Sequence, residues 1–427
     1  MSLQSFKFIY LYARFVIPRL FQVISEKIHG FLHRLTYRAV DSAQNVVVLG
    51  GSFGGIALTQ RLARTLPTGY RVILVEKNSH FNYLFNFPRY SVLQRREHLA
   101  FIPYDGIASG APAGIYQLVR GEVTSITDHA VLLTSGGEIP YAYLCVATGT
   151  SQTPPAKLRA TSDTEGCAEL QTIQAQVKAS QKIAVIGAGA VGVELATDIK
   201  SYYPEKDVTL IHSRERLLSR FGSKLHDHAL AMLEKLSIEV LLNQRPEIPT
   251  ASERWLAGRR SIQLADGQAV EYDLIIPCTG QVPNSQILES LRPDAISYST
   301  GRILVQPTLQ ISSVDKGLQK IFALGDVAET AGPKMARAAW FQADVVHENI
   351  LAMTRGKRPT KIYAPNLELE GALKLTVGKS DWLLYTQSNN GDEMITSGSN
   401  GKEDLDVESV WAFYNADFRS AVQRNLP

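Results

Sequence analysis

The stretch that decides the fold is Asn45-Val-Val-Val-Leu-Gly-Gly-Ser-Phe-Gly-Gly55, and a second stretch, Lys182-Ile-Ala-Val-Ile-Gly-Ala-Gly-Ala-Val-Gly192, repeats its plan. In each, an apolar strand enters a glycine-rich turn, and an apolar helical pattern follows to about Leu66 or Tyr202. Such turns offer free backbone N–H groups and the positive end of a helix dipole to a pyrophosphate. Because both copies have the strand before and the helix after, we expect two dinucleotide-binding sites.

The first turn departs slightly from the usual pattern of glycines. Ser52 stands where the pattern has its second glycine, and its small side chain is compatible with a retained site. The next strand ends at Glu76, 26 residues after Gly50. A carboxylate there accepts both ribose hydroxyls of an adenosine without a 2′-phosphate, which fits FAD; the alternative is an exposed charge. The FAD contacts expected in this turn are Gly50, Gly51, Ser52, Phe53, Gly54 and Gly55.

The second turn holds the complete pattern, with Gly187, Gly189 and Gly192. The strand that follows has no acidic residue at its end. The side chains there tolerate or attract a 2′-phosphate, so we expect NADPH to be accepted alongside NADH. These side chains belong to His212, Ser213 and Arg214. The alternative interpretation of Arg214 is an exposed charge in a loop.

Three other apolar strands end in small or acidic residues, where the chain can pass close to a bound dinucleotide. Two of them end in a Thr-Gly pair and one in a Gly-Asp pair. The carboxylate of the last is expected to bind ribityl hydroxyls of a flavin. The pairs are Thr148 and Gly149 on the flavin side, Thr279 and Gly280 on the NAD(P)H side, and Gly325 and Asp326 on the flavin side.

The repeated alternation predicts an α/β fold with two Rossmann-like dinucleotide-binding domains, for FAD and NAD(P), and a small C-terminal α+β segment. Ser388 to Asp406 is rich in Gly, Ser, Asn and acidic residues, and is interpreted as a flexible surface loop. An amphipathic piece at 410–422 is expected to dock on the body. The predicted domains are an N-terminal amphipathic or targeting helix at 1–43, an FAD-binding domain at 44–155 and 283–355, an NAD(P)H-binding domain at 156–282, and a C-terminal segment at 356–427.

In this order the motifs resemble the FAD-dependent pyridine-nucleotide-disulfide oxidoreductase superfamily. Within it they resemble the apoptosis-inducing-factor-like, mitochondrion-associated oxidoreductases of the ferroptosis-suppressor type, and fungal members most. The resemblance rests on the two glycine turns, the three strand ends, Phe101-Ile-Pro-Tyr104, Thr279-Gly-Gln-Val-Pro-Asn284 and Pro333-Lys-Met335. It implies further FAD contacts at Arg89 and Val123, a catalytic lysine near the flavin at Lys334, and a catalytic Glu194 near the nicotinamide. It also implies quinone reduction, with some fungal relatives acting in secondary-metabolite pathways.

The cysteines limit the reactions. The chain has three, Cys145, Cys167 and Cys278, and no two form a CxxC pair, so disulfide reductase chemistry is excluded. The region 79–93, where a peroxide-reducing relative carries its cysteine, has none. Cys145 and Cys278 lie within strands and are interpreted as buried structural thiols. Nothing predicts a metal site.

We therefore expect hydride to pass from NAD(P)H through FAD to a diffusible acceptor, a quinone by resemblance. Lys334 is expected to stabilise the reduced flavin, with a surface lysine as the alternative. Two other functions stay open: a secondary-metabolite tailoring oxidoreductase, and a redox-gated flavoprotein in signalling of the cell-death type. A net charge of only +3 argues against nucleic acid as a partner. The oligomeric state stays open.

The N-terminal segment is the hardest to interpret. Lys7, Arg14 and Arg19 interrupt an apolar run and would share one side of a helix. An interfacial membrane helix, a mitochondrial transit peptide and a helix packed on the protein itself all fit. Ser2 excludes N-myristoylation, which needs a glycine. The expected location is intracellular and associated with a membrane, with the mitochondrion as one destination.

Overall fold

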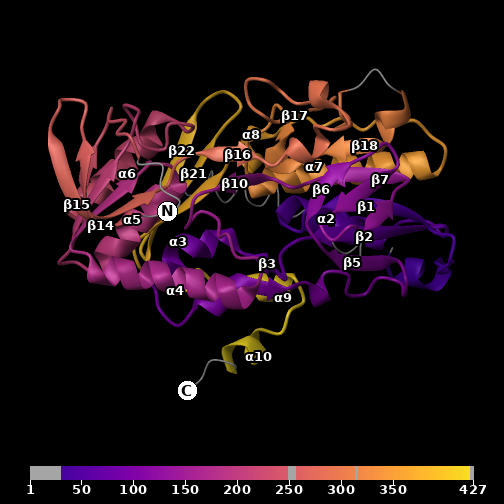
Figure 1. Cartoon of the computed structure of the whole chain (residues 1–427), viewed down its shortest axis with the longest axis horizontal. Coiled ribbons are helices and arrows are strands. Elements are labelled where there is room, and N and C mark those ends of the chain that lie inside the picture. The colour runs from indigo at the N-terminus through magenta and orange to yellow at the C-terminus, as the bar shows by residue number, and fades with distance from the viewer. Residues whose placement is uncertain (1–29, 249–255, 313–315, 424–427) are drawn as a thin grey trace. The chain divides into compact units, whose positions relative to one another are not determined.

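The computed structural model describes residues 30–248, 256–312 and 316–423. The chain forms two compact units, and each is assembled from three segments (Figure 1). The first unit comprises Met1–Phe81, Pro103–Ser151 and Val282–Gly371; the second comprises Asn82–Ile102, Gln152–Gln281 and Ala372–Pro427. Most of the predicted N-terminal helix, residues 1–29, lies outside the described residues.

The first unit is built on a parallel sheet of five strands in the order β18-β9-β1-β2-β5. A three-stranded antiparallel sheet of order β6-β7-β8 accompanies it. The main elements are β1 (Gln44–Leu49), α2 (Phe53–Ala63), β2 (Tyr70–Glu76), β5 (Tyr116–Arg120), β6 (Val123–Ile126), β7 (Ala130–Leu133), β8 (Glu138–Pro140), β9 (Tyr143–Val146), β17 (Ile303–Leu304), β18 (Ile321–Ala323), β19 (Ala328–Glu329), α7 (Ala336–Thr354) and α8 (Leu367–Glu370).

The two faces of the first sheet are covered differently. Residues of alternate parity, such as Val47 and Leu49 of β1, join one apolar core with Ile126 and Val131 of the antiparallel sheet. Helix α2 packs against β1 and β2, and α7 packs along α2 (Figure 1). Since α2 follows β1 directly through the glycine turn, this packing fixes the N-terminal end of α2 beside the carboxyl ends of the strands.

The second unit repeats this plan with a sheet of order β13-β12-β11-β15-β14, in which only the β14–β15 pair is antiparallel. A three-stranded antiparallel sheet of order β20-β21-β22 is added at the C-terminal end. The main elements are α3 (Phe87–Tyr90), α4 (Asp163–Ala179), β11 (Lys182–Ile186), α5 (Ala190–Tyr202), β12 (Asp207–Ile211), α6 (Ser223–Lys235), β13 (Glu239–Leu241), β14 (Leu256–Gln263), β15 (Ala269–Pro277), β20 (Leu373–Val377), β21 (Asp381–Gln387), β22 (Glu393–Gly398), α9 (Val407–Phe413) and α10 (Phe418–Gln423).

The core of the second unit joins the parallel sheet to the C-terminal sheet through α5. Ile183 and Val185 of β11 share one apolar cluster with Ile199 of α5, and with Leu375 and Leu383 of the C-terminal sheet. The opposite face, with Ala184 and Ile186, packs against the β14–β15 hairpin. Alternation with a period of two therefore gives each face of the sheet its own cover.

The predicted fold class is confirmed, including the C-terminal α+β segment. The interpretation of Ser388 to Asp406 as a loop is wrong in part, because β22 (Glu393–Gly398) lies within it. Its residues pair with β21, whose buried Leu383 and Tyr385 face the core, and tertiary pairing overrides the polar composition. The docking of the last segment is confirmed: Trp411 is buried, and its indole N–H donates to Leu99 O over 2.8 Å.

The compact units differ from the predicted domains, and residues 82–102 and 356–371 are two of the differences. Residues 82–102 group with the second unit, where α3 packs on α5. Residues 356–371 group with the first unit, where α8 packs on α7. Short strands lie where the chain passes between the units: β3 (His80–Asn82), β4 (Phe101–Pro103), β10 (Thr150–Gln152) and β16 (Gln281–Pro283). In the part of the chain described, no helix combines the length and apolar character needed to cross a membrane.

Candidate dinucleotide-binding sites

The first glycine turn is packed so closely that side chains are excluded from two of its positions. Gly50 has φ of +104°, and a Cβ there would lie 2.5 Å from Ala147 O. A Cβ on Gly55 would lie 1.8 Å from Gly50 O. Gly54 packs against Leu324 and Ala339, where a Cβ would meet Leu324 Cδ1 at 2.5 Å. Gly50 and Gly55 are therefore needed for the packing of the turn itself, before any ligand is considered, whereas the nearest atom at Gly54 is the end of a flexible side chain.

Gly51 is held from both sides. Its N–H donates to one carboxylate oxygen of Glu76, and the other carboxylate oxygen accepts from Asn78 N over 2.8 Å. Its carbonyl accepts from the hydroxyl of Tyr104 over 2.7 Å. Glu76 is buried, and that burial raises the pKa of its carboxyl above the ordinary value. A carboxylate has about four acceptor positions, so Glu76 retains capacity for ribose hydroxyls while it holds the turn.

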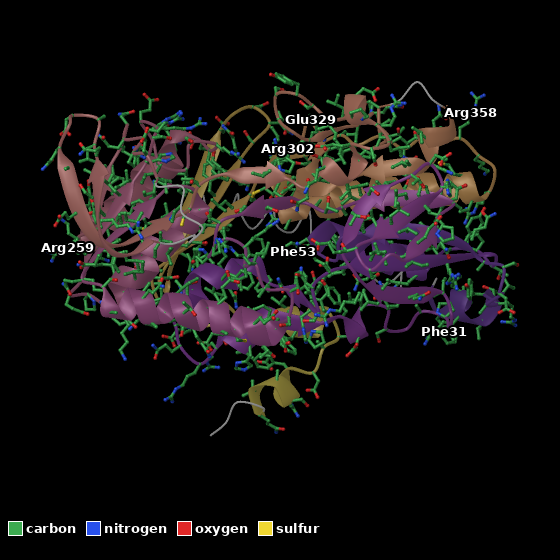
Figure 2. The ribbon with its side chains drawn as sticks, in the orientation of Figure 1. Phe31, Phe53, Arg259, Arg302, Glu329 and Arg358 are labelled. Atoms are coloured by element: carbon green, nitrogen blue, oxygen red, sulfur yellow. The ribbon has the colours of Figure 1, made fainter. Side chains whose placement is uncertain are left out.

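The remaining residues of the first turn begin α2. Ser52 is the residue before the helix, with extended backbone and no side-chain capping bond. Phe53 opens the helix (Figure 2), and its ring meets that of Phe81 edge-on, with 5.2 Å between the ring centroids. Val123 is the first residue of β6 and is half-buried. The backbone N–H groups of the first turn of a helix have no intrahelical partner, as anion binding requires.

Two strand ends complete the first site. Asn284 ties down the first of them: Thr148 Oγ1 donates to its carbonyl over 2.8 Å, and its own N–H donates to Gly149 O over 3.0 Å. At the second, Gly325 has φ of +76° and its N–H donates to Gln342 Oε1 over 2.7 Å. The half-buried carboxylate of Asp326 makes no hydrogen bond with a described residue and is available as an acceptor.

Lys334 lies just before α7. Its ammonium donates to Ala328 O over 2.7 Å and to Thr330 Oγ1 over 3.1 Å. These bonds tie the lysine to the strand and loop that follow Asp326. Its role beside the flavin stays a prediction.

The second glycine turn repeats the packing of the first. Gly187 has φ of +112°, and a Cβ there would lie 2.6 Å from Cys278 O and 3.0 Å from the methyl group of Thr279. A Cβ on Gly192 would lie 1.8 Å from Gly187 O. Gly189 differs, because a Cβ there would meet nothing within 4 Å. Its glycine is therefore not explained by protein packing, which fits close approach of a pyrophosphate. Gly280 follows with φ of +77°.

His212 holds the second turn as Glu76 holds the first. Its Nδ1 accepts the N–H of Ala188 over 3.2 Å, which requires the ring proton to be on Nε2. Burial, followed by the charge of Arg214, lowers the pKa of His212, so the ring is neutral at pH 7. Nε2 is buried and has no partner among the described residues. Ser213 and Arg214 are exposed in the loop that follows.

Glu194 lies in α5, two residues after Gly192. One of its carboxylate oxygens accepts from the backbone N–H and from the hydroxyl of Thr376 in β20, both over 3.1 Å. Burial raises the pKa of Glu194 to about 7, and the nearby Asp198 acts in the same direction. Such a carboxyl can hold or release a proton near neutral pH.

Arg89 lies in the second unit, whereas the glycine turn it was predicted to assist lies in the first. Its side chain is 1% exposed and pairs with Asp198 over 2.9 Å. It also donates to Gly378 O over 2.5 Å and to Glu403 O over 2.7 Å. These bonds fasten the C-terminal segment to α3 and α5. A contact with FAD stays a prediction that none of these bonds supports.

The residues present fit two bound dinucleotides. The first site has a close-packed glycine turn, the buried carboxylate of Glu76 and the carboxylate of Asp326, and the second has an open Gly189. Among the described residues, neither the Asp326 carboxylate nor Nε2 of His212 has a hydrogen-bond partner. Sequence reasoning missed the roles of Tyr104 and Thr376. Tyr104 was noticed only as part of a shared motif, and nothing in the sequence links Thr376 to Glu194, 182 residues earlier.

The comparisons with known proteins agree with this geometry. The model of the pyridine nucleotide-disulphide oxidoreductase family matches residues 44–343, and the chain belongs to this family. Its relatives make it an apoptosis-inducing-factor-like FAD oxidoreductase. Fe-regulated protein 8 of Mycosarcoma maydis is 30% identical over 390 residues, which cover 86% of this chain and 94% of that protein. Ferroptosis suppressor protein 1 of Mus musculus is 31% identical over 353 residues, which cover 79% and 87%.

Among solved structures, the sulfide:quinone oxidoreductase of Aquifex aeolicus has the same fold. It superposes with a TM-score of 0.68 at 17% identity, covering 90% of this chain and 92% of that one. The family binds FAD and NAD(P)H, so the predicted cofactors are confirmed. The protein is an FAD-dependent pyridine nucleotide oxidoreductase.

Proposed function

We propose that this protein passes electrons from NAD(P)H, through FAD, to a diffusible quinone without a thiol relay. The state of its cysteines is the observation that carries the proposal. All three lie among the described residues, and none forms a disulfide. Burial raises the pKa of Cys145 above its ordinary range, and it raises the pKa of Cys167 and of Cys278 to about 12. Thiols of this kind stay protonated at pH 7 and are poor nucleophiles.

The residues of the chain then have three tasks. When bound, FAD supplies the chemistry that accepts a hydride and returns electrons to an acceptor. Glu76, Tyr104 and the first glycine turn hold its adenosine end. His212 and the second glycine turn hold the nicotinamide dinucleotide, and Glu194 holds or releases a proton near pH 7. Two arguments favour a quinone as the acceptor: the family resemblance, and the lack of a reactive thiol pair that would pass electrons to a disulfide.

A kinetic panel tests this proposal. The purified protein is assayed for NADPH and NADH oxidation with menadione, a short-chain ubiquinone and oxidised glutathione. We expect turnover with both quinones and none with the disulfide. A variant that carries Cys145→Ala, Cys167→Ser and Cys278→Ala should retain FAD and quinone turnover within about threefold. A large loss of turnover in that variant, with full FAD content, would contradict direct transfer; the absence of quinone turnover in the wild type would contradict the acceptor.

We also propose that NADPH is used alongside NADH. The neutral ring of His212 offers an N–H donor where dinucleotide-binding folds that select NADH place a carboxylate, and Arg214 adds an exposed positive charge. A carboxylate would repel a 2′-phosphate, whereas an N–H and a guanidinium attract it.

Association with a membrane surface is the last part of the proposal. Residues 30–36 are helical and include Phe31 (Figure 2). The side chains of Phe31, Leu32 and Leu35 are 55%, 53% and 58% exposed. Adjacent exposed apolar side chains of this size favour a lipid interface. We expect the full-length protein to float with anionic vesicles, and a variant with serine at these three positions to float less. Equal flotation of both proteins would contradict this role for the helix; delivery to the mitochondrion stays a prediction.

A further inference from the structure

A cavity of about 580 Å³ lies in the first unit, away from the glycine turn of that unit. It is bounded by the last turn of α2, the middle of α7 and the segment that leads into α8. The glycine turn is at the opposite end of α2, roughly 15 Å away at 1.5 Å per helical residue. The cavity therefore does not belong to the site that holds the FAD pyrophosphate.

The size and walls of the cavity suit a small molecule. Ligand-binding pockets usually have volumes of roughly 300–1,000 Å³ and mainly apolar linings. Here Phe341 and Val345 come from α7, and Ile362, Tyr363 and Leu369 come from the segment around α8. An apolar ligand of matching size can pack against these side chains.

Each carboxylate that lines the cavity already has a partner. Asp344 accepts from Arg61 Nε over 2.5 Å. Glu348 pairs with Lys361 over 3.3 Å. The carboxylate of Glu370 accepts from the hydroxyl of Tyr363, and from Asn366 N over 3.0 Å. A cationic ligand would have to compete with all of these partners.

The two arginines that line the cavity keep hydrogen-bond donors that no described acceptor uses. Arg61 is only 8% exposed; its guanidinium lies over the ring of Trp340, 5.1 Å from the centroid, and its buried Nη2 makes no hydrogen bond with a described residue. Arg64 lines the same cavity, and its guanidinium makes no hydrogen bond or ion pair with any described residue. A buried donor without an acceptor is costly, which favours an anion that supplies the acceptor. His347 adds no charge, because burial lowers its pKa to about 3.

We propose that this cavity binds a small amphipathic carboxylate, whose charged group pairs with Arg64 and Arg61 and whose apolar body packs against Phe341 and Tyr363. Guanidinium and carboxylate match each other in planar, charge-assisted hydrogen bonds. Since α2 connects the cavity to the first glycine turn, a bound ligand would tie together the helices that support the flavin. This site is distinct from the first glycine turn, and its occupation does not depend on the quinone as acceptor.

Calorimetric titration of the FAD-loaded, full-length protein with sodium octanoate tests this proposal. We expect saturable binding, and at least about tenfold weaker binding of 1-octanol, because a charge-assisted bond contributes roughly 1.5–3 kcal/mol. Arg64→Gln should weaken octanoate binding about tenfold and leave octanol binding unchanged. Ala364→Trp, at an exposed position on the cavity wall, should weaken both by filling the space.

The matched control is Arg259→Gln, at an exposed arginine on β14 in the second unit (Figure 2), which should bind octanoate as the wild type does. FAD content and melting temperature verify that each variant is folded. Failure of octanoate to bind saturably overturns the proposal. So does octanoate binding that neither Arg64→Gln nor Ala364→Trp weakens, since the molecule would then occupy another place.

Discussion

The two glycine turns of this chain have the same backbone packing and differ in the side chain that holds them. In both, a Cβ on the last glycine would lie 1.8 Å from the carbonyl of the first. In both, an acceptor at the end of the neighbouring strand takes the N–H of the turn's second residue. That acceptor is the carboxylate of Glu76 at the first turn and the neutral ring of His212 at the second. The scaffold is thus common to both sites, and we expect the strand-end residue to determine which dinucleotide suits each site.

The largest expected effects come from breaking the shared packing in one turn at a time. Gly55→Ala and Gly192→Ala each place a methyl group against a backbone carbonyl, at a cost of about 3 kcal/mol or more. We expect Gly55→Ala to lose FAD or to misfold, with flavin absorbance as the measurement. Gly192→Ala should remain yellow, and NADPH should reduce its flavin at least about a hundredfold more slowly.

Gly189→Ser is the matched control for that pair, because it gives the second turn the residue that the first has at Ser52. A Cβ at position 189 meets no protein atom within 4 Å, so the variant should melt like the wild type. The NADPH affinity of Gly189→Ser should fall, but by a smaller factor than the rate of flavin reduction falls in Gly192→Ala. A melting temperature well below that of the wild type would show that Gly189 serves packing after all.

The next largest effect is expected from exchanging the strand-end acceptor. His212→Glu gives the second turn the carboxylate of the first and places a negative charge where a 2′-phosphate would bind. We expect the ratio of kcat/KM for NADPH to that for NADH to fall by about tenfold or more, because the carboxylate repels the phosphate. Steady-state kinetics with both dinucleotides measures this ratio. An unchanged ratio would mean that specificity is set elsewhere in the loop.

A smaller effect is expected at Tyr104, whose hydrogen bond to the first turn we describe for that turn alone. Tyr104→Phe removes the hydroxyl that donates to Gly51 O and keeps the ring in place. One neutral hydrogen bond contributes about 0.5–1.5 kcal/mol, so FAD should bind roughly two- to tenfold more weakly. Flavin fluorescence during reconstitution of the apoprotein measures this change. Tyr116→Phe, in β5 of the same unit, should reconstitute like the wild type.

Much of this comparison could be predicted from the sequence. The strand, glycine turn and helix are local patterns, so both units and their cofactors followed from short stretches. Glu76 and His212 could be placed because the strand length fixes where each one lies. Tyr104 and Thr376 could not be assigned roles, because each meets its partner through tertiary folding alone.

The C-terminal region shows the same limit. The residues of β22 have a polar composition typical of a loop, and become a strand because β21 offers them an edge to pair with. The resemblance places Arg89 beside the flavin, yet its bonds in the structure go to Asp198 and to three backbone carbonyls of the C-terminal segment. A motif gives the identity of a residue; its partners depend on the whole fold.

The smallest expected effect concerns the helices that follow the two turns. The second helix has Glu194 where the first has Ala57, at the same distance from the last glycine. Burial raises the pKa of Glu194 to about 7, so the carboxyl is neutral below pH 7 and charged above it. Thr376 stabilises the charged form through two bonds to one oxygen. Thr376→Val removes the hydroxyl bond and should move this pKa upward, by up to about one unit.

Stopped-flow reduction of the flavin by NADPH measures this shift. The range runs roughly from pH 5 to pH 9, about two units on either side of the expected pKa. The wild type should show an inflection near pH 7, and Thr376→Val should show it at higher pH with a similar limiting rate. Thr386→Val, a buried threonine on β21, serves as the control and should leave the inflection in place. Glu194→Gln should abolish the inflection. If it persists in Glu194→Gln, another group titrates, and the difference between the two helices has no part in proton transfer.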